Sequence, residues 1–291
     1  SAMLRDDIGG AATNLINHDQ PEDIYEIVRR EAENAMVLDN NPEFNIWGSG
    51  GCLSRALVKR PVMTTPYGAT LYGMRDQIHE ELKKQLDKGV VFPGIDSSTD
   101  MWPHCKYLAF NIYEAIGRVV ISSRLGMKWL QDVAKASNKL KRPIYWTLPT
   151  GFVVKQKYIR SIVKEIKTII NGRMASLFAG SSDAEKMHSF RQVNGIAPNF
   201  VHSLDACHLM KTIVSARDNH GIESFAVVHD SFGTHACDIE QLGMVLRETF
   251  VDIYKEDILK KFMEEQGDLE LPSLPEYGKL NIEDVKNAEF F

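Results

Sequence analysis

The sequence has few cysteines and no long apolar run. Its four cysteines are widely separated and form no CxxC pair: Cys52, Cys105, Cys207 and Cys237. This spacing excludes a disulfide-dense scaffold and favours free thiols in a reducing compartment. No apolar run approaches the length of a membrane span, and no signal peptide is visible. We therefore expect a soluble protein of the cytoplasm with no membrane partner.

An excess of positive charge is also missing. The formal net charge is -5 and the pI is about 6.0, so any contact with nucleic acid has to come from a local basic patch rather than from the overall field. What is present is an ordinary composition, with 44% hydrophobic and 25% charged residues over 291 positions. This is the composition of a globular protein of one to two domains that buries a substantial core.

The stretch ESFAVVHDSFGTHA (residues 223–236) predicts a β-hairpin with a carboxylate at its tip. The apolar run 225–228 is too short for a helix and suits a buried strand, which ends at the turn His229-Asp230-Ser231. A turn aspartate that only caps its own backbone is the simpler interpretation of Asp230. A carboxylate held rigidly at such a turn also suits a catalytic Mg²⁺, because this cation accepts one or two carboxylates and leaves room for phosphates.

A second informative pattern is a spacing of four residues in the stretch 52–73, whose first part we expect to be helical. The residues that recur are Arg55, Lys59, Met63 and Tyr67. On a helix this spacing places all four side chains in one gently curving stripe. A solvated basic face is the simpler interpretation, but a thioether and a phenol do not favour it. The stripe suits a nucleoside triphosphate, with cations for the phosphates and a flat ring for the base or sugar.

Glycine and proline delimit this predicted helix. Gly68 opens the backbone at the end of the stripe to close approach by a ligand. Pro61 predicts a kink and Pro66 predicts the end of the helix, because proline lacks an N–H group and clashes with the preceding turn.

Hydrophobic periodicity predicts further helices. One follows Asp19 as its N-cap, one covers 74–88, two occupy 107–140 with a break at Gly117, and one runs from Pro198 to about 218. The predicted inward-facing residues are Leu125, Trp129 and Val133 in the third of these regions, and His202, Ala206, Leu209, Ile213 and Ala216 in the last.

Two other stretches complete the prediction. Residues 144–147 and 152–154 form a β-hairpin around Pro149-Thr150-Gly151. The stretch that follows is basic, and we expect it to be a solvated helix and the best candidate for contacts with a phosphate backbone. Its basic residues are Lys155, Lys157, Arg160, Lys164 and Lys167.

Four motifs together resemble one family. They are RALVKRPVMTTPYGATLYG (55–73), TLPTGF (147–152), GIAPNFVHSLDACHL (195–209) and GIESFAVVHDSFGT (221–234). In this order they resemble the C-terminal part of the single-subunit, bacteriophage-type DNA-directed RNA polymerases, which have mitochondrial and chloroplast relatives. The resemblance extends over nearly the whole chain, including SAMLRDDIGG at its start.

The resemblance implies an α+β, mainly helical structure: an incomplete right-hand polymerase fold with a palm sheet and helical fingers. The segments it implies are palm at 1–20, fingers at 21–190, palm with the metal-binding hairpin at 191–262 and a C-terminal extension at 263–291.

The resemblance also implies roles for individual residues. Asp230 is the implied metal ligand and a catalytic residue, with His229 beside it. Lys59 is implied to offset charge as pyrophosphate leaves, and Tyr67 with His202 to choose ribose over deoxyribose. The implied substrate-binding set is Arg55, Lys59, Arg60, Met63, Tyr67, Gly68 and His202.

The family's first palm motif, with the other metal-binding aspartate, does not occur in this sequence. The carboxylates of Asp6, Asp7 and Asp205 do not match it. The resemblance therefore implies that two Mg²⁺ ions share Asp230 with a carboxylate from outside this chain. A second polypeptide is expected to supply the N-terminal palm and thumb, and the other partners are a DNA template, the RNA product and nucleoside triphosphates. We expect no RNA synthesis by the chain alone.

Two other interpretations remain open at this stage. A fragment of the related bacterial repair-type DNA polymerases shares the stripe and the His-Asp pair, although Ser231 and the PNFVHS stretch favour the RNA enzyme. A non-catalytic nucleic-acid-binding remnant of the fold is the third interpretation. A phage protein would act in the bacterial host cytoplasm, and an organelle is an equally open location.

Overall fold

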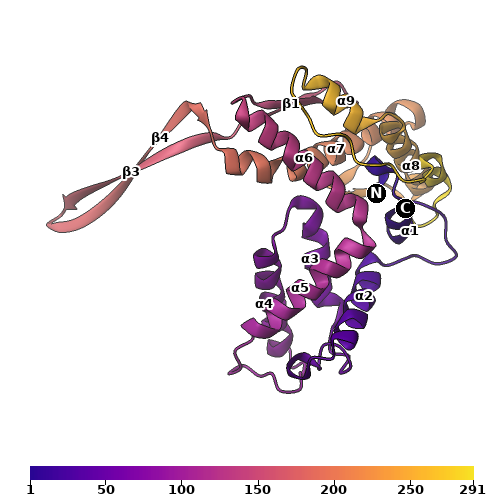
Figure 1. Cartoon of the computed structure of the whole chain (residues 1–291). Helices are drawn as coiled ribbons and strands as arrows, with labels where there is room; N and C mark the ends of the chain where they lie inside the picture. Colours follow the sequence, from indigo (N-terminus) through magenta and orange to yellow (C-terminus); the bar gives the residue numbers. More distant parts are fainter.

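The computed structural model describes the backbone of residues 1–291 and the side chains of residues 1–180 and 186–291. The chain is 56% helical with small antiparallel sheets, which confirms the predicted α+β, mainly helical class. Figure 1 shows two helical bodies joined through α6 (Ile121–Lys139), and a long hairpin that projects away from them. The two ends of the chain lie close together beside α1 (Asp7–Ala12).

The first body packs four helices around one hydrophobic cluster. Their bounds are α2 Ile24–Asp39, α3 Arg55–Thr64, α4 Leu71–Asp87 and α5 Trp102–Val119. In α4, Met74, Ile78 and Leu82 recur every four residues and are fully buried, as a core-facing stripe requires. The cluster also takes Val58 from α3 and Ile112 from α5. Short 3-10 turns occur at η1 Ala2–Leu4, η2 Pro42–Phe44 and η3 Thr65–Tyr67.

The second body packs the C-terminal half of the chain around a separate cluster. Its elements are β1 Ile144–Thr147, β2 Val153–Gln156, α7 Ser189–His220, η4 Ala236–Asp238, α8 Ile239–Lys255, α9 Ile258–Glu265 and η5 Ile282–Asn287. Trp146 of β1, Phe200 of α7 and Phe262 of α9 meet edge to face or tilted at its centre. The Trp146 indole N–H donates to Ser203 Oγ, so this buried ring has a polar partner.

The sheets are three separate two-stranded pairs. The predicted hairpin at 144–154 is confirmed as β1 and β2. The strands β5 Ala226–Val228 and β6 Ser231–Gly233 confirm the predicted hairpin around Asp230. The longest pair is β3 Ile159–Ile170 with β4 Arg173–Met187, which forms the projecting arm in Figure 1.

The prediction of a helix for the basic stretch is wrong, because Lys155 lies in β2, Lys157 lies between the strands, and Arg160, Lys164 and Lys167 lie in β3. The missed signal is Asn171-Gly172, which connects the two long strands at Ile170↔Arg173. Both residues have positive φ, 52° and 76°, as the turn of a two-residue hairpin requires.

Several predicted orientations are also wrong. In α7, His202 and Ala206 are exposed rather than inward-facing, and in α6 Leu125 is 44% exposed. The predicted buried strand 225–228 is open, with Val228 69% exposed, because no described element covers the outer face of the β5–β6 pair. Periodicity gave the elements here, but burial depends on what packs against them.

Helix boundaries differ in smaller ways. The N-cap of α2 is Asp23 rather than Asp19, and its carboxylate accepts from the backbone amides of Tyr25 and Glu26. The break predicted at Gly117 falls at Val120, and α7 begins at Ser189, with Pro198 inside it. The α-helical part of the stripe ends at Thr64 and its last turn is η3, in agreement with the end predicted near Pro66.

The four cysteines are free thiols, as predicted, and Cys105 and Cys207 are buried. Among the described residues, no helix combines the length and hydropathy needed to cross a membrane.

Candidate functional site

The stripe of α3 faces solvent. Its opposite face is anchored by Leu57, Val58 and Val62, which are buried in the first cluster, so the exposed face presents Arg55, Lys59 and Met63. Tyr67 follows on η3, which ends at Gly68 with a φ of 84°. Glycine adopts this left-handed conformation without steric cost, so Gly68 allows the chain to turn sharply just after the phenol ring.

The N-terminal end of the stripe rests on α2. The Arg55 guanidinium donates to the Asp23 carboxylate, and it lies 4.9 Å from the centroid of the Tyr25 ring. The Lys59 Nζ lies 5.9 Å from the same centroid. Burial alone would raise the pKa of Asp23, but its hydrogen bonds with Arg55 and with two backbone amides lower that pKa on balance. Tyr25 and Asp23 thus position the two cations, and neither was predicted as a site residue.

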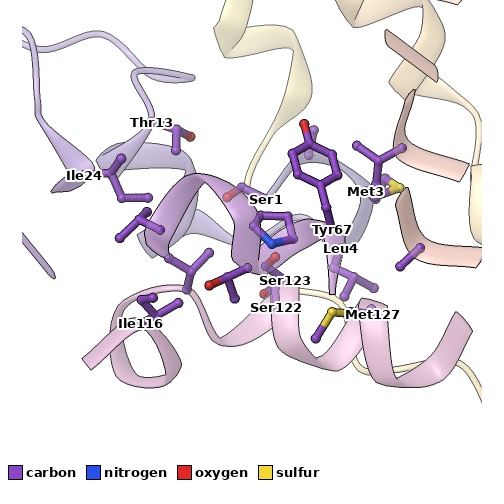
Figure 2. A pocket seen from close by; sticks show the side chains of 18 of the residues that line it. Ser1, Met3, Leu4, Thr13, Ile24, Tyr67, Ile116, Ser122, Ser123 and Met127 are labelled. Atoms are coloured by element: carbon purple, nitrogen blue, oxygen red, sulfur yellow. The ribbon is translucent and has the colours of Figure 1, made fainter. Parts of the chain in front are cut away.

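Two other predicted residues occupy different surroundings. Arg60 turns away from the stripe and forms an ion pair with Glu80 of α4. Met63 is 49% exposed and lines a mainly apolar cavity of about 350 Å³. Figure 2 shows this cavity, with Tyr67 above it and Ser122, Ser123 and Met127 below.

The C-terminal end of the stripe meets α7. The rings of Tyr67 and His202 are 4.5 Å apart between centroids and inclined by 30°. The exposed orientation of His202 is therefore what allows it to reach Tyr67. Burial, and then the negative charges of Asp205 and Asp230, raise the pKa of the Tyr67 phenol. The hairpin carboxylate is thus close enough to the stripe to act on its last residue.

The β5–β6 hairpin presents Asp230 at its tip. Val228 pairs with Ser231, which leaves His229 and Asp230 as a two-residue turn. Both are exposed, and His229 has a φ of 53°. A non-glycine residue in this left-handed region is uncommon, and such residues concentrate at functional sites.

Asp205 of α7 completes the electrostatic surroundings of Asp230. Burial has the largest effect on the pKa of Asp205 and raises it, and the negative charge of Asp230 raises it further. Electrostatic interaction with His202 and His229 lowers that pKa in part. Two carboxylates within electrostatic reach of each other form a site where a divalent cation would relieve repulsion. Within the described part of the chain, no three His, Cys, Asp or Glu side chains gather in an arrangement that would hold a metal ion by themselves. The sequence prediction gave Asp205 no role as a metal ligand, because it does not match the family's first palm motif.

The structure therefore brings three motifs together at Tyr67, His202 and Asp230. Along the chain, His202 is 135 residues and Asp230 is 163 residues after Tyr67. The structure also aligns Arg55 and Lys59 on the same exposed face. Arg60 does not join this face, because its guanidinium forms an ion pair with Glu80.

Comparison with known proteins gives a consistent result. The model of the family described as DNA-dependent RNA polymerase matches residues 1–268. The chain is 34% identical over 304 residues to "DNA-directed RNA polymerase 1B, mitochondrial" of Nicotiana tabacum. It is 32% identical over 342 residues to "T7 RNA polymerase" of Escherichia phage T7.

These two alignments cover 100% of this chain but only 29% and 38% of the relatives. The chain corresponds to the C-terminal part of these longer relatives. A third relative, "DNA-directed RNA polymerase 2A" of Nicotiana tabacum, is 34% identical and is covered over 87% of its length. The chain belongs to the phage-type DNA-dependent RNA polymerase family.

Proposed function

We propose that this chain supplies the nucleotide-binding face and one metal-binding carboxylate of a DNA-directed RNA polymerase. The reaction is transfer of a nucleotidyl group from a nucleoside triphosphate to the 3′-hydroxyl of RNA. The observation that carries the proposal is the contact between Tyr67 and His202, together with the action of the Asp230 charge on the same phenol. This arrangement supports one site built from three motifs.

The exposed stripe suits the triphosphate. Arg55 and Lys59 present two positive charges on one face of α3, and Tyr25 lies against both and limits their freedom. Holding the cations in place reduces the entropy lost when phosphate binds. Lys59 is proposed to offset charge on the leaving pyrophosphate. Arg55 and Arg60 each form an ion pair, with Asp23 and with Glu80, and each is proposed to bind phosphate once that pair opens or is shared.

The sugar is proposed to lie at the other end of the stripe. Gly68 permits close approach of the backbone, and Tyr67 with His202 forms a polar, aromatic edge beside the hairpin. Met63 would border the same nucleotide and His229 the metal side of the site. The exposure of Met63, Tyr67, His202 and His229 supports these assignments.

The donor set at the hairpin fits Mg²⁺ in part. Asp230 is an exposed carboxylate next to a second negative group, Asp205, and Mg²⁺ prefers oxygen ligands with room left for phosphate. Two bound Mg²⁺ ions would activate the RNA 3′-hydroxyl and stabilise the leaving pyrophosphate. Asp230 would hold them together with a carboxylate from outside this chain. The proposed contribution of this chain is to present Asp230 at the tip of the hairpin, close to the stripe.

The projecting β3–β4 arm is the proposed nucleic-acid contact. Arg160, Lys164 and Lys167 are exposed along β3, and exposed cations of this kind bind phosphate backbones without sequence preference. DNA template and RNA product are the proposed ligands. The division into palm (1–20 and 191–262), fingers (21–190) and C-terminal extension (263–291) is likewise part of the proposal.

A partner segment is proposed from the length of the relatives. Because this chain spans 29% and 38% of two of them, we expect an N-terminal palm and thumb to come from additional polypeptide. The cytoplasmic location stays a prediction, since the relatives include mitochondrial, chloroplastic and phage proteins by name.

The test compares the chain alone with the chain joined to, or mixed with, a polypeptide that carries the N-terminal palm and thumb of one of the longer relatives. Extension of an RNA primer on a DNA template is measured with Mg²⁺ and ribonucleotides or deoxyribonucleotides. We expect synthesis only with both parts, and with preference for ribonucleotides. Preference for deoxyribonucleotides would indicate the DNA polymerase alternative, and no synthesis by the complete assembly would contradict the proposal.

A further inference from the structure

His208 of α7 connects the β5–β6 hairpin to α8. Its ring meets the ring of Phe232 edge to face, with 5.9 Å between centroids and an angle of 63°. Phe232 lies in β6, two residues after Asp230, and pairs with Val227 of β5. The Nε2 atom of the same imidazole lies 2.9 Å from the backbone oxygen of Leu246 in α8. One side chain therefore contacts both the strand that follows Asp230 and a helix of the second body.

The His208 ring is held in one orientation. A carbonyl oxygen only accepts hydrogen bonds, so Nε2 carries a proton and donates the hydrogen bond to Leu246. Burial lowers the pKa of His208, and the hydrogen bond with Leu246 raises it in part, so the imidazole is mainly neutral at neutral pH. The ring of Phe250 packs against it at 5.6 Å and 81°, and the ring of Phe291 lies at 6.5 Å. A ring fixed in this way can orient a side chain that packs against it.

The hairpin has few other contacts that set its orientation. Its outer face is open, with Val228 69% exposed, and on its inner face Val227 and Phe232 are half-buried. Phe232 also joins a small apolar cluster formed mainly by α7 and α8. Such apolar packing is non-directional, whereas two rings prefer a defined edge-to-face geometry. The contact with His208 therefore constrains the direction of β6 and, through it, the turn that carries Asp230.

We propose that His208 is a positioning residue, which holds β6 so that Asp230 is presented in the orientation that binds Mg²⁺. This inference rests on the proposed function. A two-stranded hairpin is marginally stable by itself, so without the His208 contact it would spend less time in that orientation. The apparent affinity for the metal falls in proportion to the populated fraction, and a saturating metal concentration restores the bound state. His208 thus lowers the Mg²⁺ concentration that synthesis needs, and it acts through Phe232 rather than as a ligand.

The first experiment measures RNA synthesis by the complete assembly as a function of the free Mg²⁺ concentration. In His208→Ala we expect the half-saturating concentration to rise several-fold, with an upper limit of about tenfold, the value of one aromatic pair. The rate at saturating Mg²⁺ should stay close to that of the wild type. His208→Phe keeps a ring and should lie near the wild type. His208→Gln keeps an N–H donor but no ring and should resemble His208→Ala.

The matched control is His220→Ala, at an exposed histidine in the last turn of the same helix, which should change neither value. An unchanged half-saturating concentration in His208→Ala, or a loss of rate that saturating Mg²⁺ does not restore, would overturn the inference while leaving the proposed function intact. Failure of the wild-type assembly to make RNA would instead contradict the proposed function.

A second measurement, hydrogen exchange of the isolated chain followed by NMR, needs no activity. In His208→Ala the backbone amides of β5 and β6 should exchange faster by as much as about tenfold, because the hairpin opens more often. The amides of α4, in the first body, should exchange as in the wild type, and His220→Ala should match the wild type throughout. Equal exchange of the hairpin amides in His208→Ala and the wild type would overturn the positioning role.

Discussion

The two halves of the candidate site differ in how they are supported. The stripe is carried by α3, whose inner face is locked into the first hydrophobic cluster through Leu57 and Val58. The Asp230 hairpin has only three-residue strands, and Val228 at the turn is 69% exposed. A two-stranded hairpin is marginally stable unless something packs against it. Phe232 of the hairpin packs against the small cluster of Ala216, Ile222, Leu242 and Val245, so the hairpin depends on few contacts, whereas α3 is packed along its whole inner face.

The largest expected effect falls on the less supported half. Asp230→Asn removes the proposed metal ligand, whose charge stabilisation is worth several kcal/mol, so RNA synthesis by the complete assembly should fall roughly 10³-fold or more. Primer extension measures it. Glu223→Gln, an exposed carboxylate just before β5, is the matched control and should retain activity. Comparable activity in Asp230→Asn would place the metal side elsewhere.

A matched pair of valines tests the difference in support directly. Val58→Ala removes two methyl groups from a fully buried side chain in α3, so the free energy of unfolding should fall by about 2 kcal/mol. Val228→Ala, on the exposed hairpin, should change it by less than about 1 kcal/mol. Chemical denaturation of the isolated chain measures both. Equal losses would mean that the hairpin is as firmly packed as the helix.

The junction of the two halves should show a smaller effect. Tyr67→Phe keeps the ring that contacts His202 but removes the hydroxyl, so selection of ribonucleotides over deoxyribonucleotides should weaken by about tenfold, the value of one hydrogen bond. Met63→Leu, on the same stripe, should leave the selection unchanged. Competition between the two nucleotide types measures the ratio, and an unaltered ratio in Tyr67→Phe would argue against its role in choosing the sugar.

The smallest effect concerns the far end of the stripe. The pKa of Asp23 is lowered in the folded chain, so the unfolded state binds more protons as the pH falls through the usual aspartate range near about 4. The stability that Asp23 contributes is therefore present at neutral pH and lost in acid. Because the pair with Arg55 is exposed and screened by solvent, its contribution to the free energy of unfolding is small. The free energies of unfolding of Asp23→Asn and of the wild type should differ at pH 7 and converge in acid. A difference that grows in acid would contradict a lowered pKa for Asp23.

Local patterns in the sequence predicted much of the fold. The spacing of four from Arg55 to Tyr67 gave the exposed stripe, and the short apolar run before His229 gave the hairpin, because both signals lie within a few residues. The Asn171-Gly172 turn was equally local and was missed, since the basic residues before it were interpreted as a helix face.

Tertiary packing decided what the sequence pattern left open. His202 was predicted to face inward, but the phase of the 32-residue helix α7 turns it toward Tyr67. Tyr25 and Asp23 lie beneath the cations only because α2 packs beside α3. Asp205 lies within the motif 195–209, but the sequence does not show that the Asp230 hairpin faces it, because tertiary packing brings the two carboxylates together.

The central claim is that the stripe, His202 and the Asp230 hairpin surround one metal-bound nucleotide. The most direct measurement replaces Mg²⁺ with Fe²⁺ in the complete assembly with a bound nucleoside triphosphate, and maps backbone cleavage by locally generated hydroxyl radicals. The account predicts cleavage near Asp230 and also near Tyr67 and His202, with all three sites lost in Asp230→Asn. Cleavage confined to the hairpin, or cleavage near Tyr67 that persists in Asp230→Asn, would contradict it.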